Sequence, residues 1–357
     1  MNGALGRLGN RLSRSARDPG GGAGAEPSTE PVPPLSGYDP DAGLPFDPAR
    51  LERRIVWIWG SPRSGSTWLL RMLCHPLIPD PESTTIFRLP EDARGGRAAA
   101  AVPVDESFLS NHLSPALADP REIDGAYIPG TINNYLQARP VYAYSRAYRE
   151  VWAPEARRFA LVRLYGFLER ARSEGVELEP DPLLVIKEVN GSHAAELVMS
   201  LMPTSRLLFL VRDGRDVVDS LLHAYSPGGF LAQEQGHEFA TASERAEGLR
   251  WAARLWACNV DVTMRAIDSH PPELSRTVRY EDLLEGVGIA ELGDWLGLKL
   301  RLPAGAGASA ARATRSPTPR DRAAPPGAWR ENLSAEEQGI CTEMMGSRLE
   351  RLGYKID

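Results

Sequence analysis

A short segment near residue 60 combines glycines, hydroxyl groups and a guanidinium group in a pattern suited to binding a phosphate. It reads Gly60-Ser61-Pro62-Arg63-Ser64-Gly65-Ser66-Thr67. The apolar stretch 53–59 before it predicts a buried strand, and 66–73 predicts a helix. Backbone N–H groups converge where a strand turns into a helix, and the helix dipole adds positive charge there. The segment therefore predicts an anion site.

This turn differs from the phosphate loop of nucleotide triphosphatases, which reads GxxxxGK[ST]. Ser66 occupies the position of the lysine, and the cation, Arg63, lies within the loop itself. A cation placed there can reach the oxygen that joins a phosphate to the group being transferred. The pattern indicates a donor with a single 5′ phosphate and a transferred group other than phosphate.

A second charged segment follows the apolar strand expected over 207–211. It reads Arg212-Asp213-Gly214-Arg215-Asp216-Val217-Val218-Asp219-Ser220. Ligands bind at the carboxyl ends of parallel strands, so Arg212 is expected at the mouth of a site. Ser220, two helical turns later, can donate a hydroxyl to the same anion. For Asp216 and Asp219 we expect ordinary solvated charges on a helix surface.

Together the two segments resemble the donor-binding motifs of sulfotransferases that use 3′-phosphoadenosine 5′-phosphosulfate (PAPS). The first resembles the 5′-phosphosulfate loop, with arginine as in bacterial and Golgi-type members. The resemblance implies that Arg63 stabilises the leaving group and that Trp68 stacks on the adenine. It also implies a 5′-phosphate site formed by Ser64, Gly65, Ser66 and Thr67. The second segment resembles the family's 3′-phosphate motif, which has an Arg and a Ser eight residues apart. Arg212 and Ser220 match these two positions.

Two weaker resemblances lie further along the chain. The segment 279–284 resembles the family's Tyr-Glu-Asp turn, which implies that Tyr280 approaches the adenine. Residues 322–330 resemble the loop RKGxxGxWK that closes over the 3′ phosphate, which implies roles for Arg322 and Gly327. Ala323 and Ala324 replace a lysine and a glycine of that loop, and nearby arginines are candidates to compensate. These arginines are Arg315, Arg320 and Arg322.

Sulfuryl transfer needs a general base, cations near the transferred group and an in-line attack. The family uses a histidine or, in Golgi-type and bacterial members, often a glutamate after the first helix, which favours Glu106. Other candidates for the base are His112, Glu82 and Glu91. Lys187, at the end of a strand expected over 183–186, is expected to point towards the transferred group. The alternative for Lys187 is a surface lysine paired with Glu188. No metal is expected.

Strands alternating with helices predict an α/β fold in which a parallel sheet is covered by helices on both faces, like the P-loop nucleotide hydrolases. We expect a disordered Gly/Pro/Arg-rich tail over 1–48 and a single domain over 49–357. Residues 76 to about 155 are expected to form an insertion that binds the acceptor. Its aromatic residues include Phe87, Phe108, Tyr127, Tyr135, Tyr142, Tyr144 and Tyr148.

The composition limits the kinds of partner that we expect the protein to bind. A formal net charge of −6 argues against general nucleic-acid binding. Three distant cysteines without metal-ligand spacing and the lack of a long apolar run favour a cytoplasmic protein without a transmembrane segment. The expected acceptor is a small molecule, a carbohydrate or a lipid, and the oligomeric state is open. The alternatives are a non-catalytic protein that binds adenosine 3′,5′-bisphosphate (PAP), the donor's product, and a P-loop kinase.

Overall fold

A parallel five-stranded sheet forms the centre of the molecule in the computed structural model, which describes residues 35–75, 77–79, 87–88, 98–107, 109–113, 149–300 and 325–356. The strand order is β4-β5-β1-β6-β7. The strands are β1 (Ile55–Gly60), β4 (Ala99–Asp105), β5 (Leu178–Lys187), β6 (Arg206–Val211) and β7 (Ser275–Arg279). Each neighbouring pair is parallel. The parallel α/β sheet expected from the sequence is confirmed.

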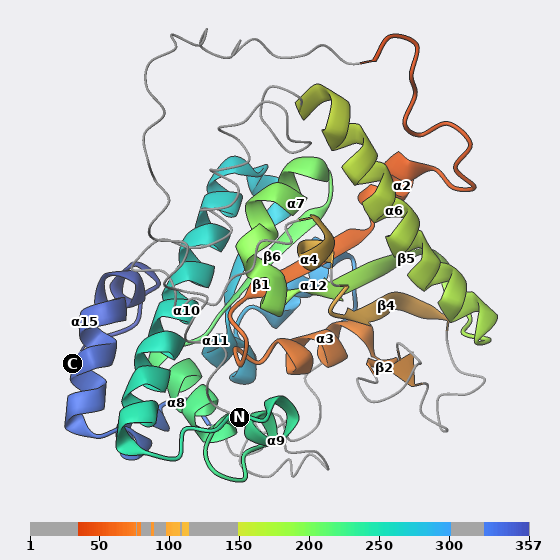
Figure 1. Ribbon diagram of the computed structural model, residues 1–357. Coiled ribbons are helices and arrows are strands. Elements are labelled where there is room, and N and C mark those ends of the chain that lie inside the picture. Colours follow the sequence, from red (N-terminus) through yellow and green to blue (C-terminus); the bar gives the residue numbers. More distant parts are fainter. Residues whose placement is uncertain are drawn as a thin grey trace, which may run out of the picture.

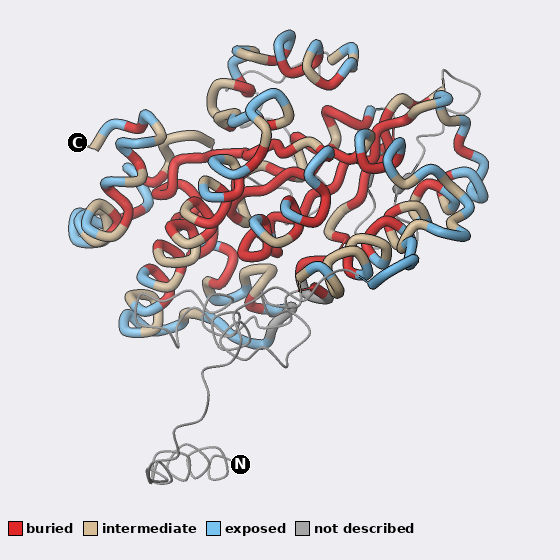
Figure 2. Tube along the Cα trace, turned by 90° about the horizontal axis from the view of Figure 1, so that it is seen from above, coloured by how far each residue is buried: buried red, intermediate tan, exposed pale blue. Residues whose placement is uncertain are grey.

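Helices cover both faces of this sheet because side chains of a strand alternate between faces. Trp57 and Trp59 belong to one core cluster, and Val56 and Ile58 belong to another. The first cluster packs on α6 (Arg149–Ser173), α7 (Ala195–Leu201), α8 (Gly214–Ala224), α10 (Ala242–Ser269) and α15 (Ala335–Arg351). The second packs on α3 (Ser66–Cys74), α11 (Tyr280–Leu284) and α12 (Ile289–Leu296). Figure 1 shows the arrangement, and Figure 2 shows burial concentrated along the strands.

The chain leaves the neighbouring strands β1 and β6 in opposite directions across the sheet, since the next strand of this sheet after β1 is β4 and the next after β6 is β7. Strands β5 and β4 extend the sheet on one side of β1, and β6 and β7 extend it on the other. The helix after β1, α3, packs on one face, whereas the helix after β6, α8, packs on the opposite face. The carboxyl ends of β1 and β6 are therefore the position at which open α/β sheets bind ligands.

Strand β5 begins at Leu178, before the range 183–186 expected from the sequence. Helix α6 begins at Arg149, and α10 spans Ala242–Ser269. The chain after β5 first forms a 3₁₀ turn, η5 (Val189–Ala194), and only then α7. Shorter elements complete the described chain: α2 (Pro48–Glu52), β2 (Ile78–Pro79), β3 (Phe87–Arg88), α4 (Leu109–Leu113), α9 (Phe230–Gln235), η6 (Pro272–Leu274) and α14 (Trp329–Asn332).

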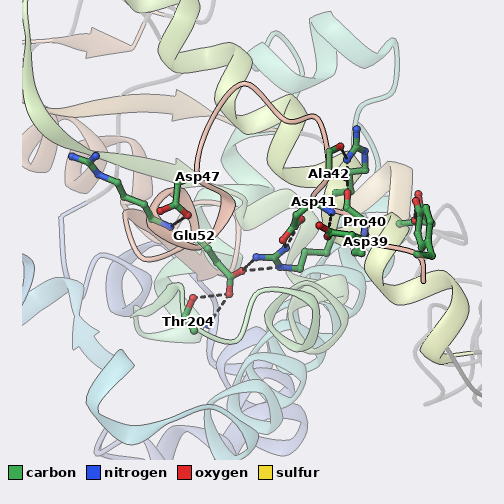
Figure 3. A network of polar contacts seen from close by, with 12 residues as sticks. Asp39, Pro40, Asp41, Ala42, Asp47, Glu52 and Thr204 are labelled. Carbon is green, nitrogen blue, oxygen red and sulfur yellow. Dashed lines mark hydrogen bonds and ion pairs between the residues drawn. The ribbon is translucent and has the colours of Figure 1, made fainter. Parts of the chain in front are cut away.

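Residues 35–48, which the sequence analysis assigns to the tail, pack on the domain. The ring of Phe46 stacks on Tyr165 of α6 at a centroid distance of 4.3 Å. Arg157 of α6 donates to both Asp41 and the buried Glu52, and Glu52 also accepts from Thr204 (Figure 3). The packed part of the chain therefore begins before residue 49, and residues 1–34 lie outside the described chain.

Candidate active site

The loop after β1 is anchored to both neighbouring strands. Ser192 of η5 accepts a hydrogen bond from the Gly60 N–H at 3.0 Å and donates to the Gly60 carbonyl at 2.6 Å. On the other side, a Cβ added at Gly60 would lie 2.5 Å from the backbone oxygen of Leu210. Only glycine fits this close approach of β1 to β6.

Polar groups of this loop are available to a ligand. Gly65 caps the N-terminus of α3 with φ of 90°, and no side chain caps the helix. The hydroxyl groups of Ser61 and Ser64 are buried and have no hydrogen-bond partner among the described residues. Buried polar groups are seldom left without a partner, and helix N-termini attract anions. The predicted segment Ser64–Thr67 thus has the properties of an anion site.

The two predicted phosphate motifs meet at three residues. Arg63 Nε donates to Ser220 Oγ at 3.0 Å, and Arg212 Nη1 donates to the Arg63 carbonyl at 2.9 Å. Arg63 has φ of 69°, which is unusual for a residue with a side chain. Such strain occurs mainly at functional sites. The Arg63 guanidinium also faces the ring of Phe230 in α9 at 5.2 Å, a neighbour that no sequence signal indicated.

The two predicted adenine-contacting aromatic residues lie beside this loop. Tyr280, at the start of α11, is 2% exposed, and its ring lies against Gly65. The guanidinium of Arg212 lies over the same ring at 5.0 Å. Trp68 meets Tyr280 edge to face at a centroid distance of 6.0 Å. Tyr280 therefore connects both phosphate motifs, and Trp68 lies next to it.

The charged residues at the start of α8 are not solvated, and this expectation from the sequence was wrong. Asp213, Arg215, Asp216 and Asp219 are all buried. Arg215 pairs with Asp213 at 2.8 Å and donates to the Lys355 carbonyl near the C-terminus. Buried ions need partners, and here the partners are partly local, as in the pair of Arg215 with Asp213, and partly in the C-terminal part of the chain.

Gly327 occupies a different role from the one that the resemblance implies. Its N–H donates to Asp216 Oδ2 at 2.8 Å, and the Trp329 N–H donates to Asp216 Oδ1 at 3.2 Å. Asn332 donates to Asp219 at 2.9 Å. The Gly327 amide is therefore engaged by α8 rather than left for a phosphate. Burial raises the pKa of Asp216 to about 6, although Arg212 and these N–H groups oppose the rise. Arg322 lies outside the described residues.

Glu106 follows β4 directly and is held in an unusual geometry. Its φ is 62°, and its N–H donates to the Lys187 carbonyl. Asn190 of η5 donates to Glu106 Oε1 at 3.0 Å. Burial raises the pKa of Glu106 to about 8, an effect that nearby Lys187 opposes and Glu188 strengthens. A carboxyl with a pKa near neutrality is suited to accept a proton, as the resemblance implies.

Lys187 contacts two carboxylates at the end of β5. It forms an ion pair with Asp105, and its Nζ lies 3.7 Å from Glu106 Oε1. The side chain is 10% exposed, so the alternative of a surface lysine paired with Glu188 is wrong. Glu188 instead accepts hydrogen bonds from Ser107 and Ser110 and so fixes the segment after Glu106. A direct contact of Lys187 with the transferred group stays a prediction.

The remaining candidates for the base are not placed by the structure. Glu82 and Glu91 lie outside the described residues, and His112 lies in α4, where its side chain is not described. Of the aromatic residues expected in the acceptor pocket, only the backbone of Phe87 is described.

The candidate base, Glu106, and the phosphate loop lie at the same end of the sheet, where the strands have their carboxyl ends. Asp105 of β4 pairs with Lys187 of β5, and Lys187 pairs with Ile58 of β1. Strands lie about 4.8 Å apart, so Glu106 lies about 10 Å from the end of β1 across the sheet. Strand β5, which ends in Lys187, lies between them.

The sequence model of the Sulfotransferase family matches residues 56–300 of the 357-residue chain. The matched range contains Arg63, Glu106, Lys187, Arg212, Ser220 and Tyr280. The chain belongs to this family.

Solved structures similar to the chain include three sulfotransferases. The sulfotransferase domain from the curacin biosynthetic pathway is 16% identical, with a TM-score of 0.40, over 85% of this chain and 98% of that domain. The domain from the Synechococcus PCC 7002 olefin synthase is 17% identical, with a TM-score of 0.41, over 85% and 95%. STF9 from Mycobacterium avium is 17% identical, with a TM-score of 0.40, over 85% and 78%. No curated protein matches the chain.

The described residues contain neither a membrane-spanning helix nor a cluster of metal ligands. No helix there has the length and apolar character needed to cross a bilayer. No group of three or more His, Cys, Asp or Glu residues is arranged to hold a metal ion in the same part of the chain.

Proposed function

We propose that this sulfotransferase uses PAPS as its donor and binds it across the ends of β1 and β6. The observation that carries this proposal is the contact of the two phosphate motifs: Arg63 with Ser220, and Arg212 with the Arg63 carbonyl. A nucleotide with phosphates at both 3′ and 5′ needs two anion sites close to each other, and these contacts hold the two segments together. Ser64 to Thr67 bind the 5′ phosphate, Arg212 and Ser220 bind the 3′ phosphate, and Trp68 and Tyr280 face the adenine.

The transfer exchanges one S–O bond for another. The acceptor hydroxyl oxygen attacks the sulfur in line, the bond from sulfur to the bridging phosphate oxygen breaks, and PAP leaves. Arg63 and the N–H groups at the start of α3 stabilise the charge that develops on the bridging oxygen. Glu106 takes the acceptor proton when it is ionised, and Lys187 stabilises that ionised form.

The acceptor is a hydroxyl compound such as a small metabolite, a carbohydrate or a lipid. A cytoplasmic location, an insertion that binds the acceptor, and a site that needs no metal belong to the same proposal. The burial of Glu106 between β4 and η5 supports its role, because a solvated carboxylate has too low a pKa to accept a proton efficiently at neutral pH.

Calorimetric titration with PAP tests the donor site. We expect the wild-type chain to bind PAP, and Arg212→Ala to weaken that binding at least about tenfold, because hydrogen bonds between charged groups contribute about 1.5–3 kcal/mol. Arg348→Ala is the matched control, since Arg348 pairs with Asp261 of α10 and has no proposed part in donor binding. PAP binding that does not respond to Arg212→Ala would contradict the proposed 3′-phosphate site.

A further inference from the structure

One face of α8 carries two buried carboxylates beside a proposed donor-binding hydroxyl. Asp216 lies three residues before Asp219 and four residues before Ser220, so its side chain neighbours both of theirs on the helix surface. Asp216 also interacts electrostatically with Arg212. The two carboxylates therefore lie next to the site proposed for the 3′ phosphate.

Both carboxylates bind the same C-terminal turn. Asp216 accepts the N–H groups of Gly327 and Trp329 with separate oxygens, and Asp219 accepts the side-chain amide of Asn332. We call residues 327–332 the docked turn. Hydrogen bonds to a charged acceptor are roughly twice as strong as neutral ones, so these contacts tie the docked turn firmly to α8.

The indole of Trp329 completes the attachment. Trp329 is 3% exposed, and the guanidinium groups of Arg215 and Arg330 lie over its ring at 4.0 Å and 4.4 Å from the centroid. Arg215 is itself fixed by Asp213 at the start of α8. The docked turn is thus held both by polar contacts and by ring stacking from the helix that follows Arg212.

We propose that Asp216 and Asp219 are positioning residues for donor binding, an inference that rests on the proposed function. They hold the docked turn on α8 and thereby fix the helix that presents Ser220 and follows Arg212. Neither carboxylate contacts the donor. The docked turn in return donates hydrogen bonds to the two carboxylates that lie beside the phosphate site.

The charge of the Asp216 carboxylate and its positioning role predict opposite changes in PAP affinity when the residue is replaced. A carboxylate near a phosphate repels it, so replacing Asp216 by a neutral residue would tighten PAP binding if the carboxylate acted only through its charge. A positioning role requires weaker binding, because the asparagine amide would face a backbone N–H and the docked turn would lose part of its attachment.

The experiment is calorimetric titration of the full chain with PAP for the wild type, Asp216→Asn and the control Asp261→Asn. Asp261 pairs with Arg348 between α10 and α15, so the control makes the same chemical change outside the site. We expect about tenfold weaker binding for Asp216→Asn and less than about a twofold change for the control. In turnover, the KM for PAPS rises for Asp216→Asn while kcat stays within about twofold.

Asn332→Ala provides a second test because it leaves both carboxylates in place. We expect it to weaken PAP binding in the same direction, and it decides the question if Asp216→Asn does not fold. Tighter or unchanged PAP binding in a folded Asp216→Asn, or in Asn332→Ala when only that variant folds, overturns the positioning role. Failure of the wild type to bind PAP overturns the proposed function, and this inference with it.

Discussion

At the scale of single residues, the environment of Glu106 determines what the site can do. The resemblance to sulfotransferases indicated Glu106 as the base, but its neighbours Lys187, Glu188 and Asn190 lie more than 80 positions later in the sequence. Only the pairing of β4 with β5 brings them together. For this reason the burial and the raised pKa of Glu106 could not be predicted from the sequence.

Replacing Glu106 by glutamine should lower kcat by about 10²–10⁴-fold, the usual contribution of a general base. Wild-type kcat should rise with pH through about 8, where Glu106 ionises, and the variant should lack that step. Initial rates of PAP release between pH 6 and 9, with an acceptor that the wild type uses, test this. A similar pH step in the variant would assign the base to another group.

The same pKa predicts a change of stability with pH. The folded chain holds a proton on Glu106 up to about pH 8, whereas the unfolded chain releases it near the ordinary value of 4.5. Stability contributed by this group is therefore lost as pH rises between these values. Denaturant unfolding of Glu106→Gln should show a smaller fall in stability from pH 5 to 8 than the wild type shows, and an equal fall would contradict the burial of this carboxyl.

The role of Lys187 can be determined from whether its replacement shifts the pH profile of kcat. Its positive charge opposes the rise in the pKa of Glu106, so Lys187→Gln should move the pH profile of kcat to more alkaline values. If Lys187 instead contacts only the transferred sulfuryl group, kcat should fall at every pH without such a shift. The pH dependence of initial rates for wild type and variant distinguishes the two roles.

At the scale of elements, the turn from β1 into α3 was readable from the sequence because its conformation is local. The apolar strand, the glycines and the helix start lie within about twenty residues, and the structure has them where they were expected. The start of α8 was misread because its charges find partners more than 100 residues away, in the docked turn and at Lys355. Local sequence carries no signal for such contacts.

Gly65→Ala tests the packing of this turn against α11. A Cβ at Gly65 would lie 2.3 Å from the Tyr280 ring, and the residue has φ of 90°. Gly297→Ala is the matched control, because Gly297 has φ of 69° but nothing within 4 Å of an added Cβ. Both should lose about 1–2 kcal/mol of stability from the left-handed conformation. In calorimetric titrations, Gly65→Ala alone should also weaken PAP binding, and equal PAP affinities would contradict a role for this contact.

At the scale of the whole molecule, the sheet separates two polar networks. The proposed site lies at the carboxyl ends of the strands, whereas Glu52, Arg157 and Thr204 join α2, α6 and the start of β6 near the other ends (Figure 3). The alternation of apolar strands and helices predicted the layered architecture, since continuous apolar runs indicate strands that are buried on both faces of a sheet. The order of the strands, and the packing of residues 35–48, required the structure.

Glu52→Gln tests the independence of these two networks. Glu52 is 2% exposed and accepts from both Arg157 and Thr204, so the change should lower stability by about 3 kcal/mol. The proposed site lies at the carboxyl ends of the strands, and Glu52 lies near their other ends. PAP affinity should therefore stay within about twofold of wild type at a temperature where the variant is folded. A large loss of PAP affinity in the folded variant would show that the two ends of the sheet are coupled.

Use of PAPS is the central claim, and calorimetric titration of the wild-type chain with PAP, AMP, and ATP plus Mg²⁺ tests it most directly. We predict that PAP binds at least about tenfold more tightly than AMP, which lacks the 3′ phosphate that Arg212 and Ser220 are proposed to hold. ATP with Mg²⁺ should bind weakly, because Ser66 occupies the position of the phosphate-loop lysine. Equal affinity for PAP and AMP, or preference for ATP with Mg²⁺, would contradict the account.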